Sequence, residues 1–190
     1  MQVIRKADPE FKVSLAGNFH KELEADIYDY CIPIGASYPA EVLARRAQNN
    51  LPTTYYTCCT EAFPNTFTFS DPAEAAWMSY YSAKDHLDGY LRWAYNSWPK
   101  EPLLDSRFEA WAGGDTYLVY PGARSSIRFE KLIEGVQAHE KITILRKEFT
   151  DKKNKTGFKK LEKMLSTFNL RDFPEVPAAE TVNKAVSYTH

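Results

Sequence analysis

The sequence contains few cysteines, and their arrangement argues against a disulfide-stabilised scaffold. Its 190 residues include only three, Cys31 and the adjacent pair Cys58 and Cys59. An odd number without framework spacing is not typical of a disulfide-rich secreted domain. Neighbouring residues on a strand point to opposite faces, so the adjacent pair is not expected to form a bridge. We therefore predict three reduced, buried thiols.

Long apolar runs are also absent, and the net charge is small. Residues 1–11 are polar and charged and lack the apolar core of a signal peptide. No segment reaches the roughly 20 apolar residues that span a bilayer. The formal net charge is −1, and Lys and Arg are scattered. We therefore expect a soluble chain with no nucleic-acid partner and no membrane partner. Its localisation stays open, because a longer parent protein could be periplasmic or secreted.

The sequence also lacks the short motifs of several enzyme classes. It contains no CxxC or HExxH pattern and no glycine-rich phosphate loop. None of its four histidines lies near a Ser or Cys in a nucleophile-elbow motif, so triad catalysis is not supported. We expect no metal and no cofactor.

The chain does have enough apolar residues for a real core, because 44% of its residues are hydrophobic. Strand and helix patterns alternate along its first half: strands over residues 12–17, 26–34, 53–60 and 90–98, and helices over about 37–49 and 70–89. Such alternation implies parallel strands with right-handed crossovers. The predicted fold class is α/β, the C-terminal half of a (β/α)₈ TIM-type barrel, with about four parallel strands and their helices, plus C-terminal helices.

The second half of the chain has a different pattern of predicted elements. A long loop over residues 99–114 leads to a fifth predicted strand over 115–120 and to an amphipathic helix that starts at Ser125 or Ser126. A charged break at 151–155 precedes a second helix, and the tail beyond residue 169 is expected to wrap the surface. The sequence predicts a partial barrel domain over residues 1–148 and a helical appendage over residues 149–190.

The stretch from Tyr90 to Trp98 carries the strongest functional signal. It alternates large apolar and polar residues, as a strand does, and it ends in Tyr95, Asn96, Ser97 and Trp98. Aromatic faces pack against the C–H groups of a sugar, while amides and hydroxyls bond its hydroxyls. The working residues of parallel barrels follow the strands, which predicts a carbohydrate pocket with Trp93 deeper and Tyr95 nearer the rim. The alternative is a packed strand whose aromatics only fill a core.

Acidic residues give less guidance. A glycosidase needs a proton donor together with a carboxylate nucleophile or a group that assists a nucleophile on the substrate. The candidate acids are scattered along the chain: Asp29, Glu61, Asp88, Asp105 and Asp115. Asp105 and Asp115 could accept hydrogen bonds from sugar hydroxyls, although Asp105 is also placed to pair with Arg107. No pair of acids is brought together by the pattern.

Five segments together resemble a known family: Tyr55–Thr60, Pro64–Phe67, Gly89–Trp98, Gly114–Gly122 and Ser126–Glu130. In this order they are similar to the domain-of-unknown-function 4091 family, the carboxyl-terminal part of glycoside hydrolase family 123. The match covers roughly residues 12–148. It implies a (β/α)₈ catalytic barrel and β-N-acetylgalactosaminidase activity. In that family the acetamido group of the substrate attacks the anomeric carbon, assisted by an adjacent Asp-Glu pair.

The resemblance carries over no catalytic residue, because no Asp-Glu dipeptide occurs in the 190 residues. The substrate-binding residues that it implies by position are Trp93, Tyr95, Asn96, Trp98, Tyr55 and Asp115. We therefore expect a fragment of a glycoside hydrolase that acts on N-acetylated hexosamine glycans, supplies the sugar-binding wall and is inactive alone. The alternative is a non-catalytic carbohydrate-binding or assembly module, completed by another chain that supplies the missing half-barrel.

Overall fold

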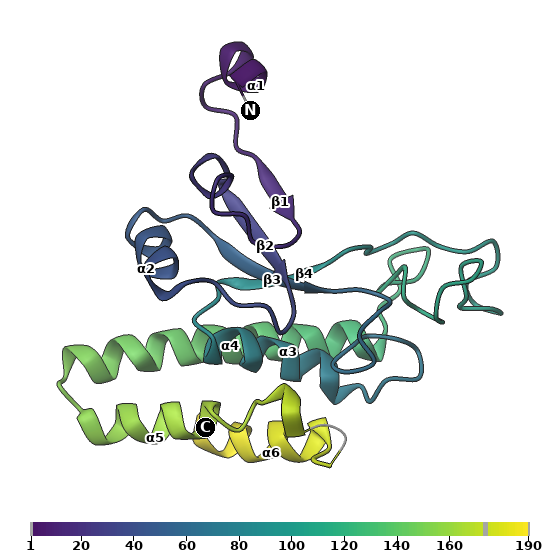
Figure 1. The fold of residues 1–190 in the computed structure, drawn as a ribbon. Coiled ribbons are helices and arrows are strands. Elements are labelled where there is room, and N and C mark those ends of the chain that lie inside the picture. The colour runs from purple at the N-terminus through teal and green to yellow at the C-terminus, as the bar shows by residue number, and fades with distance from the viewer. Residues whose placement is uncertain (1, 173–174, 190) are drawn as a thin grey trace. The chain divides into compact units, whose positions relative to one another are not determined.

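The structure, a computed structural model, describes residues 2–172 and 175–189 and divides into two compact units. The first unit contains the described residues up to Tyr56 together with Leu87–Leu91. The second contains Thr57–His86 and the described residues from Arg92 onward. Figure 1 labels the helices and strands of both units.

The first unit is built around a parallel sheet of four strands in the order β1-β2-β3-β4. The strands are β1 (Ser14–Ala16), β2 (Asp29–Pro33), β3 (Thr53–Thr57) and β4 (Gly89–Arg92). This unit also contains α1 (Gln2–Ala7), the short helix η1 (Glu24–Asp26) and α2 (Ala40–Gln48). The centre of β2 is fully buried, as expected for a parallel sheet that is covered on both faces.

A buried arginine ties α2 to the loops before the central strands. The side chain of Arg46 is fully buried, and its guanidinium donates to the carbonyls of Ile27, Tyr28 and Pro52 and to the Glu24 carboxylate. Since a buried charge needs both a counter-ion and hydrogen bonds, these partners explain how a charge is accommodated there.

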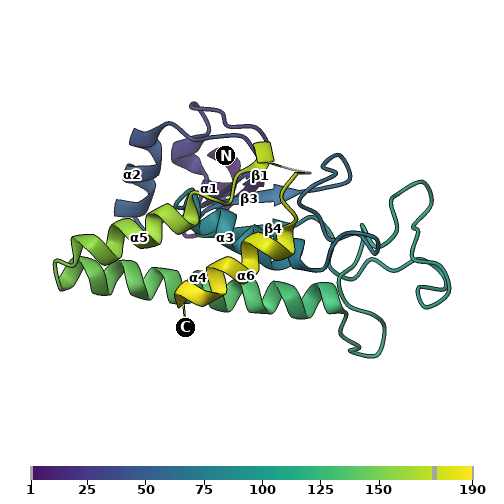
Figure 2. The same cartoon turned by 90° about the horizontal axis from the view of Figure 1, so that it is seen from below.

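The second unit is helical, with α3 at its centre. Its helices are α3 (Ala73–Lys84), α4 (Ile127–Asp151), α5 (Lys155–Leu165), η2 (Leu170–Asp172) and α6 (Ala178–Thr189). The helix α3 is buried on nearly every side because α4, α5 and α6 all pack against it. Figure 2 shows α4 and α5 running side by side in opposite directions. The Phe168 ring, in the turn after α5, stacks on Tyr80 of α3 at a centroid distance of 4.6 Å.

The elements differ from the sequence prediction in several places. The predicted strand over 90–98 ends at Arg92, and residues 115–120 form turns with isolated antiparallel bridges instead of a strand. The short helix α1 was not predicted, and the tail expected to wrap the surface forms α6. The predicted start of α4 is confirmed, since the Ser126 hydroxyl accepts a hydrogen bond from the Phe129 amide.

The cysteine prediction is only partly confirmed. All three thiols are free, and Cys31 is buried, but Cys58 is half-buried and Cys59 is exposed. The prediction of burial was wrong for Cys59 because β3 ends at Thr57, and the adjacent pair lies in the following turn. A residue outside the strand no longer follows the alternation between two faces.

Within the described residues, no helix combines the length and the apolar character that crossing a bilayer requires.

Candidate functional site

The candidate site begins where the chain leaves β4, and its first feature is a buried ion pair in the second unit. The guanidinium of Arg92 donates to a side-chain oxygen of Asp115 and to the Asp115 carbonyl. The Arg92 side chain is 4% exposed and the Asp115 side chain is fully buried. Arg92 also donates to the side-chain oxygen of Asn65 at 2.9 Å. This network turns the Arg92 side chain toward two loops that are distant in sequence.

Asn65 is the second member of the network, and it is buried. Its side-chain amide donates to the carbonyls of Cys58 and Glu61, each at 2.7 Å, and its backbone amide donates to the Glu74 carboxylate at 2.8 Å. Glu74 lies in the first turn of α3. Burial raises the pKa of Glu74, although these backbone hydrogen bonds oppose the shift. Asn65 thus joins the turn after β3 to α3 and to Arg92.

A second buried arginine, Arg128 on α4, holds the same loops from the other side. Its guanidinium donates to the carbonyls of Thr66, Gly114 and Tyr117. Burial lowers the pKa of Arg128. Gly114 has a positive φ of 77°, and a Cβ atom at this position would lie 2.7 Å from the Arg128 guanidinium. A glycine is therefore required where the backbone approaches this cation.

Two tryptophans form an exposed pair beside the network. The Trp93 indole N–H donates to the Asp115 carboxylate at 3.2 Å, and its ring lies 5.6 Å from that of Trp111 at an angle of 46°. Trp93 is 43% exposed and Trp111 is 40% exposed. We refer to these two side chains as the tryptophan pair. Exposed aromatic faces held by a buried anchor suit a ligand with an apolar face, such as a sugar ring.

Trp111 was not among the predicted site residues. It lies in the long loop over residues 99–114, and loops of this length inside a compact domain are usually functional. The sequence signal was the presence of a tryptophan in a loop of this length. No local pattern indicates which strand end that loop approaches.

The residues that follow Trp93 are held by the segment 116–119. The amide of Ser97 donates to the Thr116 carbonyl at 3.0 Å, and the amide of Leu118 donates to the Tyr95 carbonyl at 2.8 Å. The Trp98 indole donates to the Val119 carbonyl at 2.7 Å. These bonds order the backbone of a segment that is not a strand of the sheet. They also orient the side chains that follow β4.

The predicted site residues have different environments. Tyr95 is 48% exposed and its ring packs edge-on against Phe129, while Asn96 and Trp98 are exposed. Trp93 is as open to solvent as Tyr95, so the difference in depth predicted for these two does not appear. Tyr55 lies in the first unit, is 1% exposed and packs against Tyr90. The structure thus brings Trp93 and Asp115 together directly, and the roles predicted for the other residues stay predictions.

The acidic side chains near these loops are engaged in local structure. The Glu61 carboxylate accepts hydrogen bonds from the Cys58 amide and the Thr60 hydroxyl. Asp105 pairs with Arg107, whose side chain donates to it and lowers the pKa of Asp105 to about 2. The Asp115 carboxylate accepts a hydrogen bond from Trp93, but it is buried against Arg92. Within the described residues, no group of three or more His, Cys, Asp or Glu side chains could hold a metal ion.

The chain matches a family model and a solved structure. A family model described as the catalytic domain of glycoside hydrolase 123 matches residues 1–145. No curated protein matches the chain.

The chain is also similar to a solved structure of a family 123 glycoside hydrolase from Clostridium perfringens. The two are 24% identical with a TM-score of 0.73. The similarity covers 94% of this chain and 35% of that chain, so this chain spans about a third of the length of its relative. The structure reported for that relative concerns glycolipid glycan hydrolysis. The likeness confirms the predicted fold class, four parallel strands with helices as in part of a TIM-type barrel.

The covered 94% is more than the 145 residues that the family model matches. The predicted boundary at residue 148 stays a prediction. The helices α5 and α6, which belong to the predicted appendage, pack against α3 in the second unit.

Proposed function

This chain belongs to the glycoside hydrolase 123 family, and we propose that it supplies the part of a glycoside hydrolase that grips a glycan ending in an N-acetylated hexosamine. The proposed contacts are made by the second unit, at the loop that follows β4. The tryptophan pair packs on the sugar ring. The polar groups of the sugar are bonded or covered by Tyr95, Asn96 and Trp98.

One observation carries this proposal: two indole rings are exposed next to each other, and one of them, that of Trp93, is anchored by the buried Asp115 carboxylate. Large apolar side chains are normally buried, because each contributes about 1.5–3 kcal/mol when removed from water. An exposed pair in which one ring is held by a hydrogen bond to a buried carboxylate is better explained by a ligand that covers it.

The choice of an N-acetylated hexosamine rests on the family resemblance and on the kind of surface. A tilted aromatic pair can cover both the C–H face of a pyranose and an acetamido methyl group, whereas a single ring covers only one of them. The relative from Clostridium perfringens hydrolyses the glycan of a glycolipid, and we include glycolipid glycans among the proposed substrates.

For hydrolysis we propose that this chain depends on acids that its 190 residues do not supply. The family resemblance assigns the chemistry to an adjacent Asp-Glu pair, and no Asp-Glu dipeptide occurs in the sequence. Glu61 and Asp115 do not replace such a pair, because each is engaged in holding a loop. The 190-residue chain by itself should therefore bind sugar without cleaving it.

A titration tests the binding part of the proposal. N-Acetylgalactosamine should change the tryptophan fluorescence of the chain in a saturable way, and galactose, which lacks the acetamido group, should bind more weakly. Trp98 also contributes to the fluorescence, so the change in signal must be assigned by repeating the titration with Trp93→Ala. Equal responses to both sugars would exclude recognition of the N-acetyl group. The lack of any response to either sugar would overturn the proposal.

An assay with an aryl β-N-acetylgalactosaminide tests the catalytic part. We expect no release of the aryl alcohol above the uncatalysed rate. Robust turnover by the purified chain would contradict the assignment of catalysis to an Asp-Glu pair that this sequence does not contain.

A further inference from the structure

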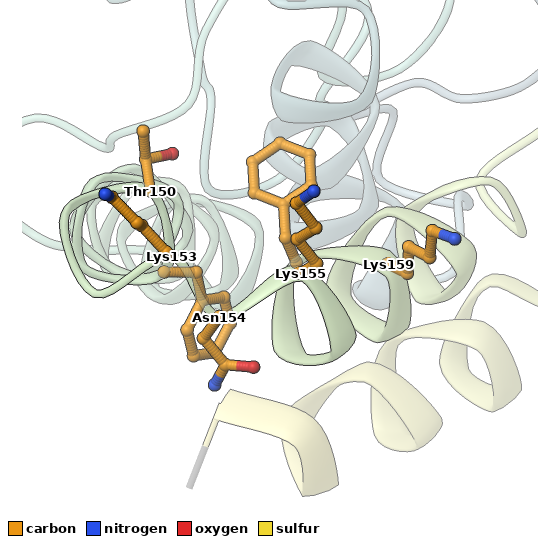
Figure 3. A pocket seen from close by; sticks show the side chains of 7 residues that line it. Thr150, Lys153, Asn154, Lys155 and Lys159 are labelled. Carbon is orange, nitrogen blue, oxygen red and sulfur yellow. The ribbon is translucent and has the colours of Figure 1, made fainter.

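A hollow of about 400 Å³ lies in the second unit, where α4 ends and α5 begins. This volume is within the range of about 300–1,000 Å³ that is typical of small-molecule pockets. Seven residues line it: Phe149, Thr150, Lys153, Asn154, Lys155, Phe158 and Lys159. Figure 3 shows this hollow at close range, with Lys155 and Lys159 on α5 and Lys153 in the turn that precedes it.

The floor of the hollow is apolar. Phe149 and Phe158 are both half-buried. A Cβ atom on Gly157 would lie 3.0 Å from the Phe149 ring, so the glycine allows this ring to lie against the first turn of α5. Two of the polar groups in the wall are already bonded. The Thr150 hydroxyl donates to the Arg146 carbonyl, and the Asn154 side-chain oxygen accepts from the Gly157 amide.

The rim of the hollow is positively charged. Nearby carboxylates are neutralised by other lysines, since Lys147 pairs with Asp151 and Lys152 pairs with Glu148. In the described part of the chain, no carboxylate forms an ion pair with the three rim lysines, Lys153, Lys155 and Lys159. The formal net charge of the chain is −1, so this positive charge is a local feature and does not reflect a basic protein.

We propose that this hollow binds an anionic amphiphile, with the alkyl chain against Phe149 and Phe158 and the acidic headgroup on the rim that carries the three lysines. The two halves of such a ligand match the two parts of the site. An alkyl chain gains free energy by covering the aromatic floor, in proportion to the area that it removes from water. A phosphate or carboxylate gains from the ammonium groups on the rim, for which the described residues supply no ion-pair partner.

Other occupants match the site less well. A free anion would leave the apolar floor exposed, and exposed lysines alone hold an anion weakly in water. An acidic peptide would bring backbone N–H and C=O groups against aromatic rings that offer them no hydrogen bonds, which costs free energy. An alkyl chain has no such polar groups.

This inference refines the sequence prediction that no membrane partner exists. That prediction rested on scattered Lys and Arg and on the net charge of the whole chain. The fold gathers three lysines around one apolar hollow, which suits a single lipid molecule or detergent anion. The proposal does not depend on sugar binding, because none of its residues belongs to the loops around the tryptophan pair.

Calorimetric titration of the whole chain with dodecyl phosphate, below its micelle-forming concentration, tests the proposal. We expect saturable binding of one molecule per chain. Inorganic phosphate, which lacks the alkyl chain, and dodecylphosphocholine, whose headgroup has no net charge, should each bind at least about tenfold more weakly. Octyl phosphate should bind more weakly than dodecyl phosphate, because it buries less apolar surface.

Charge variants locate the site without disturbing the core. Changing the three rim lysines together to glutamine should weaken dodecyl phosphate binding at least about tenfold. A matched variant with Lys6, Lys21 and Lys100 changed to glutamine loses the same charge elsewhere and should bind like the unchanged chain. The amide of Gly157 should shift in the nuclear magnetic resonance spectrum of the bound chain.

Four results would overturn the proposal. They are no binding of dodecyl phosphate, equal binding of dodecylphosphocholine, equal binding of inorganic phosphate, and the same loss of affinity in both lysine variants. Polyglutamate that binds more tightly than dodecyl phosphate, and is lost with the rim lysines, would assign this face to an acidic polypeptide instead. A Trp93 variant that no longer binds sugar should still bind dodecyl phosphate. Failure of one proposal can therefore be distinguished from failure of the other.

Discussion

The indole N–H of Trp93 donates to the buried carboxylate of Asp115, and the distance of 3.2 Å joins two residues that are 22 positions apart. The same carboxylate oxygen accepts from Arg92, while the second oxygen of Asp115 has no partner among the described residues. One buried anion therefore fixes the exit of β4 and the orientation of an exposed ring. Asp115 is a positioning residue for Trp93 in this arrangement.

Replacing Asp115 with asparagine should destabilise the chain by about 3 kcal/mol. The substitution keeps the shape and one acceptor oxygen for Trp93, but it leaves the Arg92 charge buried without a counter-ion. Removal of one partner of a buried ion pair typically costs about 3–5 kcal/mol. Urea unfolding followed by circular dichroism measures the change in the free energy of unfolding.

A double variant separates the charge effect from simple loss of packing. Changing Arg92 to glutamine together with Asp115 to asparagine removes both charges, so part of the lost stability should return. The Arg92→Gln single variant completes the comparison. If the stability losses of the two single variants simply add up in the double variant, the two side chains do not interact as the structure indicates.

Replacing Trp93 with alanine should weaken the binding of N-acetylgalactosamine by about tenfold or more, which is about 1.4 kcal/mol. The ring is exposed and forms half of the tryptophan pair, so its loss removes the face on which the sugar packs. Isothermal titration calorimetry measures the affinity without depending on indole fluorescence. Tyr188 on α6 is similarly exposed, and Tyr188→Ala is the control that should leave the affinity unchanged. Unchanged affinity in the Trp93 variant would remove the tryptophan pair from the proposed site.

The sequence predicted the strands β1 to β4 and the helices α2 to α5 because local patterns determine them. β-Branched and aromatic residues mark β3, and Ser126 marks the start of α4 by capping it. The end of β4 was placed too late because its cause is not local. Arg92 bonds to Asn65 and Asp115, which are 27 and 23 residues away, and this draws the chain out of the sheet.

The helix α6 shows a different limit of sequence reasoning. The tail with Pro174 and Pro177 was expected to wrap the surface, and no helix was placed in it, but a proline just before a helix is compatible with its start. The apolar residues Ala178, Val182 and Ala185 share one buried face at helical spacing. The proximity of Trp111 to Trp93 could not be predicted at all, because the loop over 99–114 has no periodicity that would orient it.

Replacing Gly135 with alanine should destabilise the chain by about 1–3 kcal/mol. A Cβ atom here would lie 2.9 Å from the Cα and carbonyl oxygen of Ala76, where α4 packs on α3, and neither backbone atom can move independently of its helix. The usual effect of this substitution in a helix is the opposite, a gain of up to about 1 kcal/mol. Thermal and urea unfolding measure the sign. Gln137→Ala, at an exposed position on the same helix, should change stability by less than about 0.5 kcal/mol.

The cysteines should differ in their rate of alkylation. Burial raises the pKa of Cys31 to about 11. The pKa of Cys59 is also raised, by a partial loss of hydration and by the neighbouring Cys58, but Cys59 is exposed. Because the thiolate is the nucleophile, Cys59 should react with N-ethylmaleimide in the folded chain and faster as the pH rises, whereas Cys31 should react only after unfolding. Peptide mapping by mass spectrometry assigns the sites. Modification of Cys31 in the folded chain at the same rate as Cys59 would contradict its burial.

Acidification should destabilise the chain in part through His86. Burial lowers the pKa of His86 and nearby Arg146 lowers it further, whereas Glu162 and Asp85 oppose the shift. A base whose pKa is lower in the folded state favours folding in its neutral form. Its contribution to stability is therefore present above the unfolded-state pKa of about 6.5 and is lost as the pH falls through the lower folded-state pKa.

Replacing His86 with asparagine isolates this contribution from the other titrations of the chain. His86 has a positive φ of 55°, and asparagine tolerates this backbone conformation better than most residues. Melting temperatures should fall more steeply in the unchanged chain than in the variant as the pH is lowered from about 8 to about 5, since only the unchanged chain must protonate an imidazole beside Arg146. Parallel curves would mean that His86 has the same pKa in the folded and unfolded states, and a steeper fall in the variant would reverse the direction derived from its burial.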